Sequence, residues 1–165
     1  MIFREMRRSA QQLGEAECLE LLAEASSGVL ALTGDGGYPY AVPLSFAYSG
    51  GKIYFHGAAS GHKFDAALKD PRASFCVITS DDIVPEKFTT RYRSVIVFGK
   101  IRYIEDDAEK RRALLLLCDK YCPGEKSEAV EAEIAKDFGR VCIAELTAEH
   151  ITGKQGREFL RASDE

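Results

Sequence analysis

Residues 28–58 alternate short apolar runs with glycine-rich turns, in the order "GVLALTGDGGYPYAVPLSFAYSGGKIYFHGA". The runs at 29–32, 40–48 and 53–56 have the length of strands, and the turns at 34–37 and 49–51 contain glycines that tolerate positive φ. Strands joined by such short turns run antiparallel, because parallel neighbours need a long crossover connection. This segment therefore favours an antiparallel barrel over a parallel sheet.

The remaining chain predicts further strands and several helices around this meander. We expect strands at 73–79, 91–106 and 141–154, a polar connection at 80–90, and helices at 15–25, 61–68, 107–121 and 128–138. Pro43 cannot donate to a ladder, so it predicts an edge or a bulge, and Gly99 predicts a bulge or bend. The predicted fold is mainly β with peripheral helices (α+β), an antiparallel β-barrel forming a single domain over residues 1–165.

Composition excludes several classes of function. The net charge of −4 argues against a nucleic-acid binder, and no apolar run is long enough to cross a membrane. The start of the chain lacks the apolar core of a signal peptide, so we expect a cytoplasmic protein. The odd number of cysteines suits that compartment, and all five are expected to be buried and reduced: Cys18, Cys76, Cys118, Cys122 and Cys142. We expect no metal site, because further ligands at matching spacing are missing.

A strand-to-helix turn holds the most chemically suggestive residues. Ser60, His62 and Lys63 fall at the start of the predicted helix 61–68, with Ser60 as its expected N-cap, where free N–H groups and the helix dipole favour an anion. An ordinary capped helix with a solvated lysine explains the same residues. His56 ends an apolar strand and shares a face with Tyr54; it is either a titrating group that faces a ligand or a histidine satisfied in the barrel wall.

Two other stretches offer ligand contacts without an evident nucleophile. The backbone of Val42, Leu44 and Ser45, beside Pro43, could serve a flat heteroaromatic ligand, although an edge strand with a proline explains it equally well. Arg91, Arg93 and Ser94, near the start of another predicted strand, could supply further contacts to an anion or a ring, or the two arginines could simply lie on a solvent face. Because no nucleophile motif, P-loop or dinucleotide fingerprint is present, the chemistry of an enzyme here would belong to a cofactor.

The stretches "YAVPLSFAY", "KIYFHGAASGHKFDAALKD", "PRASFCV", "YRSVIVFGK" and "ITGK" together resemble the FMN-binding split-barrel proteins. The chain is most similar to the pyridoxamine-5'-phosphate-oxidase-like branch that includes the nitroimidazole-resistance proteins, over roughly residues 4–155. The resemblance implies a homodimer of six-stranded split barrels with FMN at the subunit interface. It places the flavin ring along Val42, Pro43, Leu44 and Ser45, the phosphate at Ser60, His62 and Lys63, and His56 near the flavin. Ser94 and Val95 match the stretch that approaches the cofactor, from the same or the other subunit.

The end of the chain departs from the pattern of true pyridoxamine-phosphate oxidases. Its "GKQGREFLRASDE" lacks their C-terminal motif, so vitamin B6 oxidation is not expected, and haem is not expected without a histidine-rich tail. The predicted function is an FMN-dependent oxidoreductase. It would pass electrons from a reduced nicotinamide or a reductase to a small electron-poor acceptor such as a nitroaromatic, with His56 as the candidate catalytic residue. The alternative is a non-catalytic module that binds or senses flavin.

Overall fold

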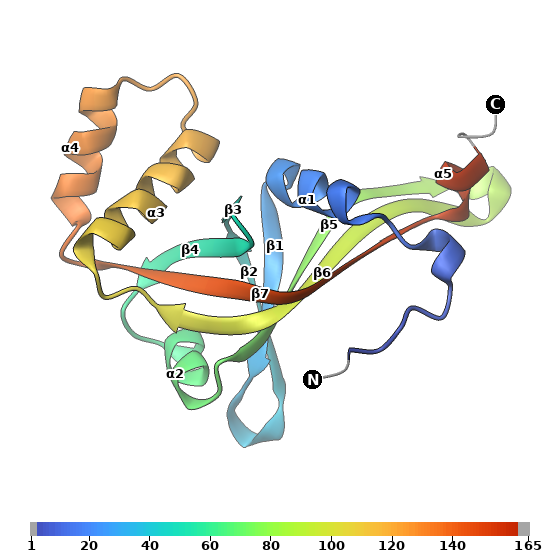
Figure 1. Ribbon diagram of the computed structural model, residues 1–165, viewed down its shortest axis with the longest axis horizontal. Coiled ribbons are helices and arrows are strands. Elements are labelled where there is room, and N and C mark those ends of the chain that lie inside the picture. Colours follow the sequence, from blue (N-terminus) through green and yellow to red (C-terminus); the bar gives the residue numbers. More distant parts are fainter. Residues whose placement is uncertain (1–2, 162–165) are drawn as a thin grey trace.

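The computed structural model describes residues 3–161 (Figure 1). The strands in this range are β1 (Ser27–Thr33), β2 (Pro39–Ser45), β3 (Ala47–Ser49), β4 (Lys52–Ala58), β5 (Arg72–Val84), β6 (Thr89–Tyr103) and β7 (Val141–Gln155). The α-helices are α1 (Glu15–Glu24), α2 (His62–Lys69), α3 (Asp107–Tyr121), α4 (Ser127–Asp137) and α5 (Arg157–Arg161). Short 3₁₀ turns lie at Ser9–Gln11, Asp35–Gly37 and Pro85–Lys87.

All the strands belong to one antiparallel sheet in the order β2-β1-β5-β6-β7-β4-β3. This confirms the mainly β, antiparallel fold predicted from the glycine turns. The two edge strands, β2 and β3, follow each other in the chain, because the single strand expected at 40–48 divides at the fully buried Phe46. Within residues 3–161 no ladder joins these two edges, so the sheet does not close into a barrel by hydrogen bonds, and it contains seven strands rather than six.

Aromatic packing holds the curved sheet together where hydrogen bonds do not. Phe46, Phe55 and Phe75 are fully buried and come from the β2–β3 junction, β4 and β5. The Phe75 ring centroid lies 4.8 Å from that of Phe46, edge-on, and 5.2 Å from that of Phe55. Rings of this size contribute large apolar areas, so this cluster draws the two ends of the sheet toward one core.

The two backbone irregularities predicted from the sequence are confirmed. Pro43 lies in β2, which pairs only with β1 among the described strands and is therefore an edge strand. Gly99 follows a register shift in the β6–β7 ladder after Phe98. A Cβ atom at Gly99 would overlap the carbonyl oxygen of Thr147, so the close approach of the two strands at this bulge requires glycine.

The polar connection expected at 80–90 is wrong. β5 continues to Val84 and β6 begins at Thr89, so the two strands form a long ribbon that reaches the end of the molecule near α5 (Figure 1). A two-stranded ribbon exposes much of both faces and needs no apolar alternation. The polar residues 80–82 ("SDD") can therefore pair in the ladder, although the sequence there shows no alternation of apolar and polar residues.

Helix α3 is capped by Asp106 and anchors the β2–β3 junction at its end. The Asp106 side chain accepts a hydrogen bond from the Glu109 N–H at 2.7 Å. At the other end, the Tyr121 hydroxyl accepts from the Phe46 N–H at 2.7 Å and lies 2.8 Å from the Phe46 carbonyl and 2.6 Å from that of Ser26. The neighbouring Lys120 ammonium lies 4.0 Å from the centroid of the Phe46 ring. The α3–α4 hairpin thereby fixes the chain where it crosses from one sheet edge to the other.

A buried carboxylate links three strands on the outer side of the sheet. Glu145 of β7 is 1% exposed and accepts hydrogen bonds from Lys52 of β4 at 3.0 Å and from Arg102 of β6 at 3.0 Å and 3.1 Å. Burial by itself raises the pKa of Glu145, but the hydrogen bonds from the two cations outweigh it, so the pKa is lowered. The ionised carboxylate therefore stabilises the fold.

The five cysteines are free, as expected, but only Cys18 is fully buried and Cys122 is exposed. Cys122 directly follows the last residue of α3, and it lines a cleft rather than the core. None of the helices within residues 3–161 combines the length and apolar character that crossing a membrane requires.

Candidate functional site

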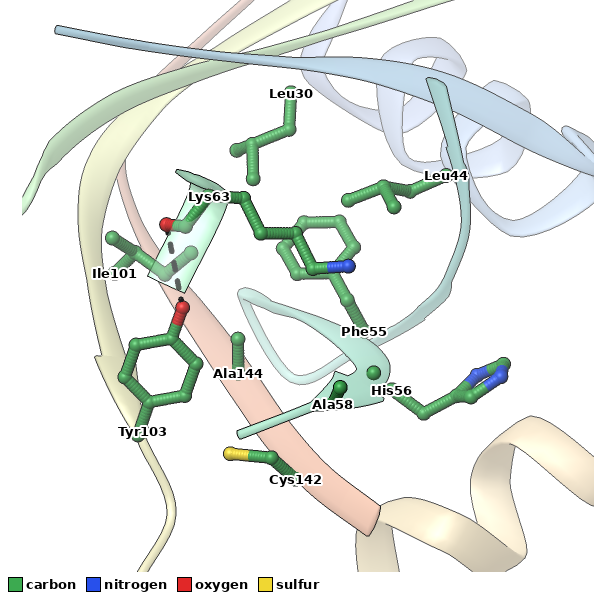
Figure 2. Close-up of a pocket in the computed structure, with 11 residues that line it drawn as sticks. Leu30, Leu44, Phe55, His56, Ala58, Lys63, Ile101, Tyr103, Cys142 and Ala144 are labelled. Carbon is green, nitrogen blue, oxygen red and sulfur yellow. Dashed lines mark hydrogen bonds between the residues drawn. The ribbon is translucent and has the colours of Figure 1, made fainter. Parts of the chain in front are cut away.

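A narrow cavity lies where β2, β4, α2 and β7 meet (Figure 2). Its volume is about 10 Å³. Its lining residues are Leu30, Leu44, Phe55, His56, Gly57, Ala58, Lys63, Ile101, Tyr103, Cys142 and Ala144. A ligand larger than a water molecule would lie across the mouth of this cavity rather than inside it.

His56 points out of the sheet because of its position in β4. Ile53 and Phe55 are buried on the core side, while Tyr54 is half-buried and His56 is exposed on the other side, as the alternation predicts. Figure 2 shows the imidazole extending away from Lys63 and Ala144. Among residues 3–161, no hydrogen-bond or ion-pair partner engages the ring. The imidazole is therefore free to meet a ligand.

Lys63 brings a positive charge to the same cavity. Its ammonium passes the backbone of Gly57, where an added Cβ atom would lie only 2.9 Å from Nζ. In Figure 2 the side chain runs toward Leu44 and His56. Within the described part of the chain, no carboxylate pairs with this ammonium. An unpaired cation beside a helix start is suited to an anion.

Tyr103 holds the backbone of Lys63 from the other side. Its hydroxyl donates a long hydrogen bond, 3.5 Å, to the Lys63 carbonyl oxygen, and its ring centroid lies 4.2 Å from that of Phe64. Burial raises the pKa of Tyr103 to about 12, so the phenol stays protonated and remains a donor at neutral pH.

The start of α2 differs from the prediction. The N-cap is Gly61, with φ of 108°, and not Ser60, which is exposed and lies one residue too early to cap the helix. Only glycine adopts this φ readily, so the turn into the helix depends on it. The His62 ring stacks on Tyr40 at 4.0 Å between centroids, and its Nε2 lies 3.7 Å from a carboxylate oxygen of Asp35. Ser60 and His62 therefore do not line the cavity.

The remaining predicted contacts are distributed over two strands. In β2, Leu44 lines the cavity, the half-buried Val42 packs against the core, and Pro43 and Ser45 are exposed. In β6, the Val95 side chain is fully buried and Ser94 is half-buried, and neither lines the cavity. The structure thus brings together Leu44, His56 and Lys63.

A second, larger cleft separates β4 from the α3–α4 hairpin. Its volume is about 510 Å³, and His56 and Ser45 stand at its sheet side. The other lining residues are Leu114, Leu117, Cys118, Tyr121, Cys122, Glu133, Ile134, Asp137 and Val141. This cleft was not predicted from the sequence, because the two helices were expected to be peripheral. The available signal was the apolar spacing 114, 117, 118 and 121, which marks one helix face.

Within residues 3–161, no group of three or more histidine, cysteine, aspartate or glutamate side chains is arranged to hold a metal ion.

A model of the pyridoxamine 5'-phosphate oxidase family matches residues 14–155. The chain belongs to this family. The resemblance stated from the sequence motifs is thereby confirmed. A search of curated proteins gives no match.

Solved structures share the fold of this family member at low sequence identity. A protein from Bacteroides thetaiotaomicron assigned to 5-nitroimidazole antibiotic resistance is 23% identical, covering 87% of this chain and 86% of its own, with a TM-score of 0.74. A conserved hypothetical protein from Mycobacterium tuberculosis is 19% identical over 94% of this chain and 92% of its own, with a TM-score of 0.80. An FAD-binding protein from Mesorhizobium loti is 24% identical over 88% of this chain and 97% of its own, with a TM-score of 0.65. These similarities establish a fold shared with flavin-binding proteins.

Proposed function

We propose that this member of the pyridoxamine 5'-phosphate oxidase family binds FMN and acts as an oxidoreductase toward a small electron-poor acceptor such as a nitroaromatic. The observation that carries the proposal is the meeting of Leu44, His56 and Lys63 around one cavity. These residues supply an edge strand for a flat ring, an imidazole and an unpaired ammonium. When bound, FMN would accept a hydride from a reduced nicotinamide, or electrons from a reductase, and release them to the acceptor.

The residues present fit the two ends of FMN. The free edge of β2 leaves alternate backbone donors and acceptors unpaired, which suits the polar edge of a flavin ring. Lys63 and the first N–H groups of α2 suit the phosphate, since Gly61 opens the helix without a side chain over its start. Ser60 and His62 would need to turn from their present positions to reach the phosphate.

His56 is the group that we assign to proton transfer. Its ring is exposed and unpaired within the described residues, and an imidazole can hold or release a proton near neutral pH. Reduction of an electron-poor acceptor consumes protons, so an imidazole beside the acceptor would assist the step.

A homodimer is the assembly that we infer. Val29, Cys76 and Ile96 lie in register across β1, β5 and β6 and face outward, with the exposed Ile78 and Phe98 nearby. This contiguous apolar face is typical of a surface that is covered by a second subunit. Ser94 lies on β6 beside this face, so the interface would bring it near the partner's cofactor. The expected buried area is on the order of 2,000 Å² or more, and light scattering that gives a monomer at micromolar concentration would remove this part of the proposal.

The test of the cofactor is the effect of Lys63→Ala on two flavins. Removing the ammonium should weaken FMN binding by roughly 10- to 150-fold, equivalent to about 1.5–3 kcal/mol for a charged hydrogen bond. Riboflavin, which lacks the phosphate, should bind equally to wild type and variant. Affinities can be measured by quenching of flavin fluorescence during titration of the flavin-free protein.

Lys69→Ala is the matched control, because Lys69 is an exposed lysine in the last turn of the same helix. It should leave both affinities unchanged. Equal losses for FMN and riboflavin in Lys63→Ala would contradict a phosphate contact. Failure of wild type to bind either flavin would contradict the proposed function, and flavin binding without reduction by NADH, NADPH or a reductase would favour the non-catalytic module.

A further inference from the structure

We propose that the cleft between β4 and the α3–α4 hairpin is the binding site for the electron acceptor, and that it selects an uncharged, flat aromatic molecule. This inference rests on the proposed function, since it names the substrate class of the same site. In Figure 1 the α3–α4 hairpin stands beyond β4 at one end of the sheet, on the side where the cleft lies.

His56 connects the cleft with the cavity assigned to the cofactor. It lines both spaces, while Leu44 and Ser45, adjacent in β2, line one each. A molecule in the cleft would therefore lie on one side of the imidazole, with Lys63 and the cofactor mouth on the other. This arrangement places the assigned proton donor between acceptor and cofactor.

The lining of the cleft determines the class of ligand. Leu114, Leu117, Ile134 and Val141 supply apolar walls, and Tyr121 adds an aromatic one. Among residues 3–161, no lysine or arginine lines the cleft. Its two carboxylates, on Glu133 and Asp137, form ion pairs with Lys136 and Arg140. A carboxylate or phosphate on the ligand would lose its hydration without gaining a cation, which is costly. The cleft of about 510 Å³ is in the size range of small-molecule pockets.

Ile134 places the middle of α4 at the wall of the cleft. Its side chain is buried, yet it belongs to neither of the two clusters of buried apolar residues. Polar contacts attach α4 to α3 at two points. Arg111 forms an ion pair with Glu131, and the Lys110 ammonium donates to the Phe138 carbonyl oxygen at 2.5 Å. The helix is thus attached at two points on either side of Ile134, whose side chain lines the cleft.

The absence of tryptophan from the sequence allows a direct binding test. Ile134→Trp places a single tryptophan in the cleft, and Ala135→Trp places one on the exposed side of the same helix turn. Nitrobenzene, a neutral quencher, should quench the fluorescence at position 134 saturably and at position 135 only linearly by collision. The charged analogue 4-nitrobenzoate should bind at position 134 at least tenfold more weakly, because its carboxylate finds no cation. Leu114→Trp, on α3, provides a second probe of the same cleft if Ile134→Trp does not fold by circular dichroism.

The absorption spectrum of the same samples separates the two proposals. A flavin spectrum with linear quenching at positions 114, 134 and 135 alike would overturn the cleft as acceptor site while leaving the cofactor assignment intact. Saturable quenching at position 134 without any flavin binding would contradict the proposed function and would show only a binding site for neutral aromatic molecules. Equal affinities for nitrobenzene and 4-nitrobenzoate would overturn the selection of uncharged ligands.

Discussion

Replacing Tyr121 by phenylalanine should destabilise the protein at the junction between β2 and β3. The hydroxyl accepts from the Phe46 N–H at 2.7 Å and, having one proton, donates to either the Phe46 carbonyl at 2.8 Å or that of Ser26 at 2.6 Å. Phe46 is fully buried between the two sheet edges, so its N–H has no ladder partner to replace the hydroxyl. Leaving that N–H unsatisfied costs about 1–3 kcal/mol, and losing the donated bond about 0.5–1.5 kcal/mol. The expected total is roughly 1.5–4.5 kcal/mol.

Urea unfolding followed by circular dichroism at pH 7 measures this change in the free energy of unfolding. The matched control is Tyr103→Phe, whose hydroxyl makes one hydrogen bond of 3.5 Å to the Lys63 carbonyl and should cost under about 1 kcal/mol. Because both variants keep their aromatic ring, the difference between them isolates the hydroxyl of Tyr121. A loss below about 1 kcal/mol for Tyr121→Phe would refute the reasoning, since it would mean that the Phe46 N–H is satisfied without this hydroxyl.

Three further changes test other parts of the structure. Gly99→Ala should lower the free energy of unfolding by about 2–4 kcal/mol in the same assay, because its Cβ overlaps the Thr147 carbonyl, and an unchanged midpoint would contradict the bulge. Glu145→Gln should lower the free energy of unfolding by about 2–4 kcal/mol at pH 7. Because folding lowers the pKa of Glu145, this loss of stability should be full above the ordinary pKa of 4.5 and should shrink as the pH falls through the pKa of the folded state. An equal loss at pH 7 and pH 3 would exclude the ionised carboxylate as its source. His56→Asn should leave flavin bound but slow reoxidation of the reduced flavin by a nitroaromatic by ~10²–10⁴-fold in stopped-flow measurements, and unchanged rates across pH 5 to 8 would eliminate a proton-donor role.

Local features of the sequence were enough to predict most of the secondary structure. Glycine turns, the edge position of Pro43 and the bulge at Gly99 each depend on the conformational or hydrogen-bonding limits of one residue type. Alternation also placed His56 on the same face as Tyr54. The family followed from the order of several motifs, and the family match confirms it. These properties are carried by short stretches and change little with tertiary context.

Only the tertiary structure decided which of the chemically suggestive residues lie together. Ser60, His62 and Lys63 are near neighbours in sequence, yet the turn at Gly61 directs His62 to Tyr40 and Lys63 to the cavity. The cleft beside His56 depends on where α3 and α4 dock, which is determined by contacts such as the one between Tyr121 and Phe46, 75 residues apart. The split of the predicted strand at Phe46 has the same origin, because only packing against the distant Phe75 makes that residue a corner. Contacts between residues far apart in the chain leave no local pattern, so the sequence predicted the elements while packing assembled the site.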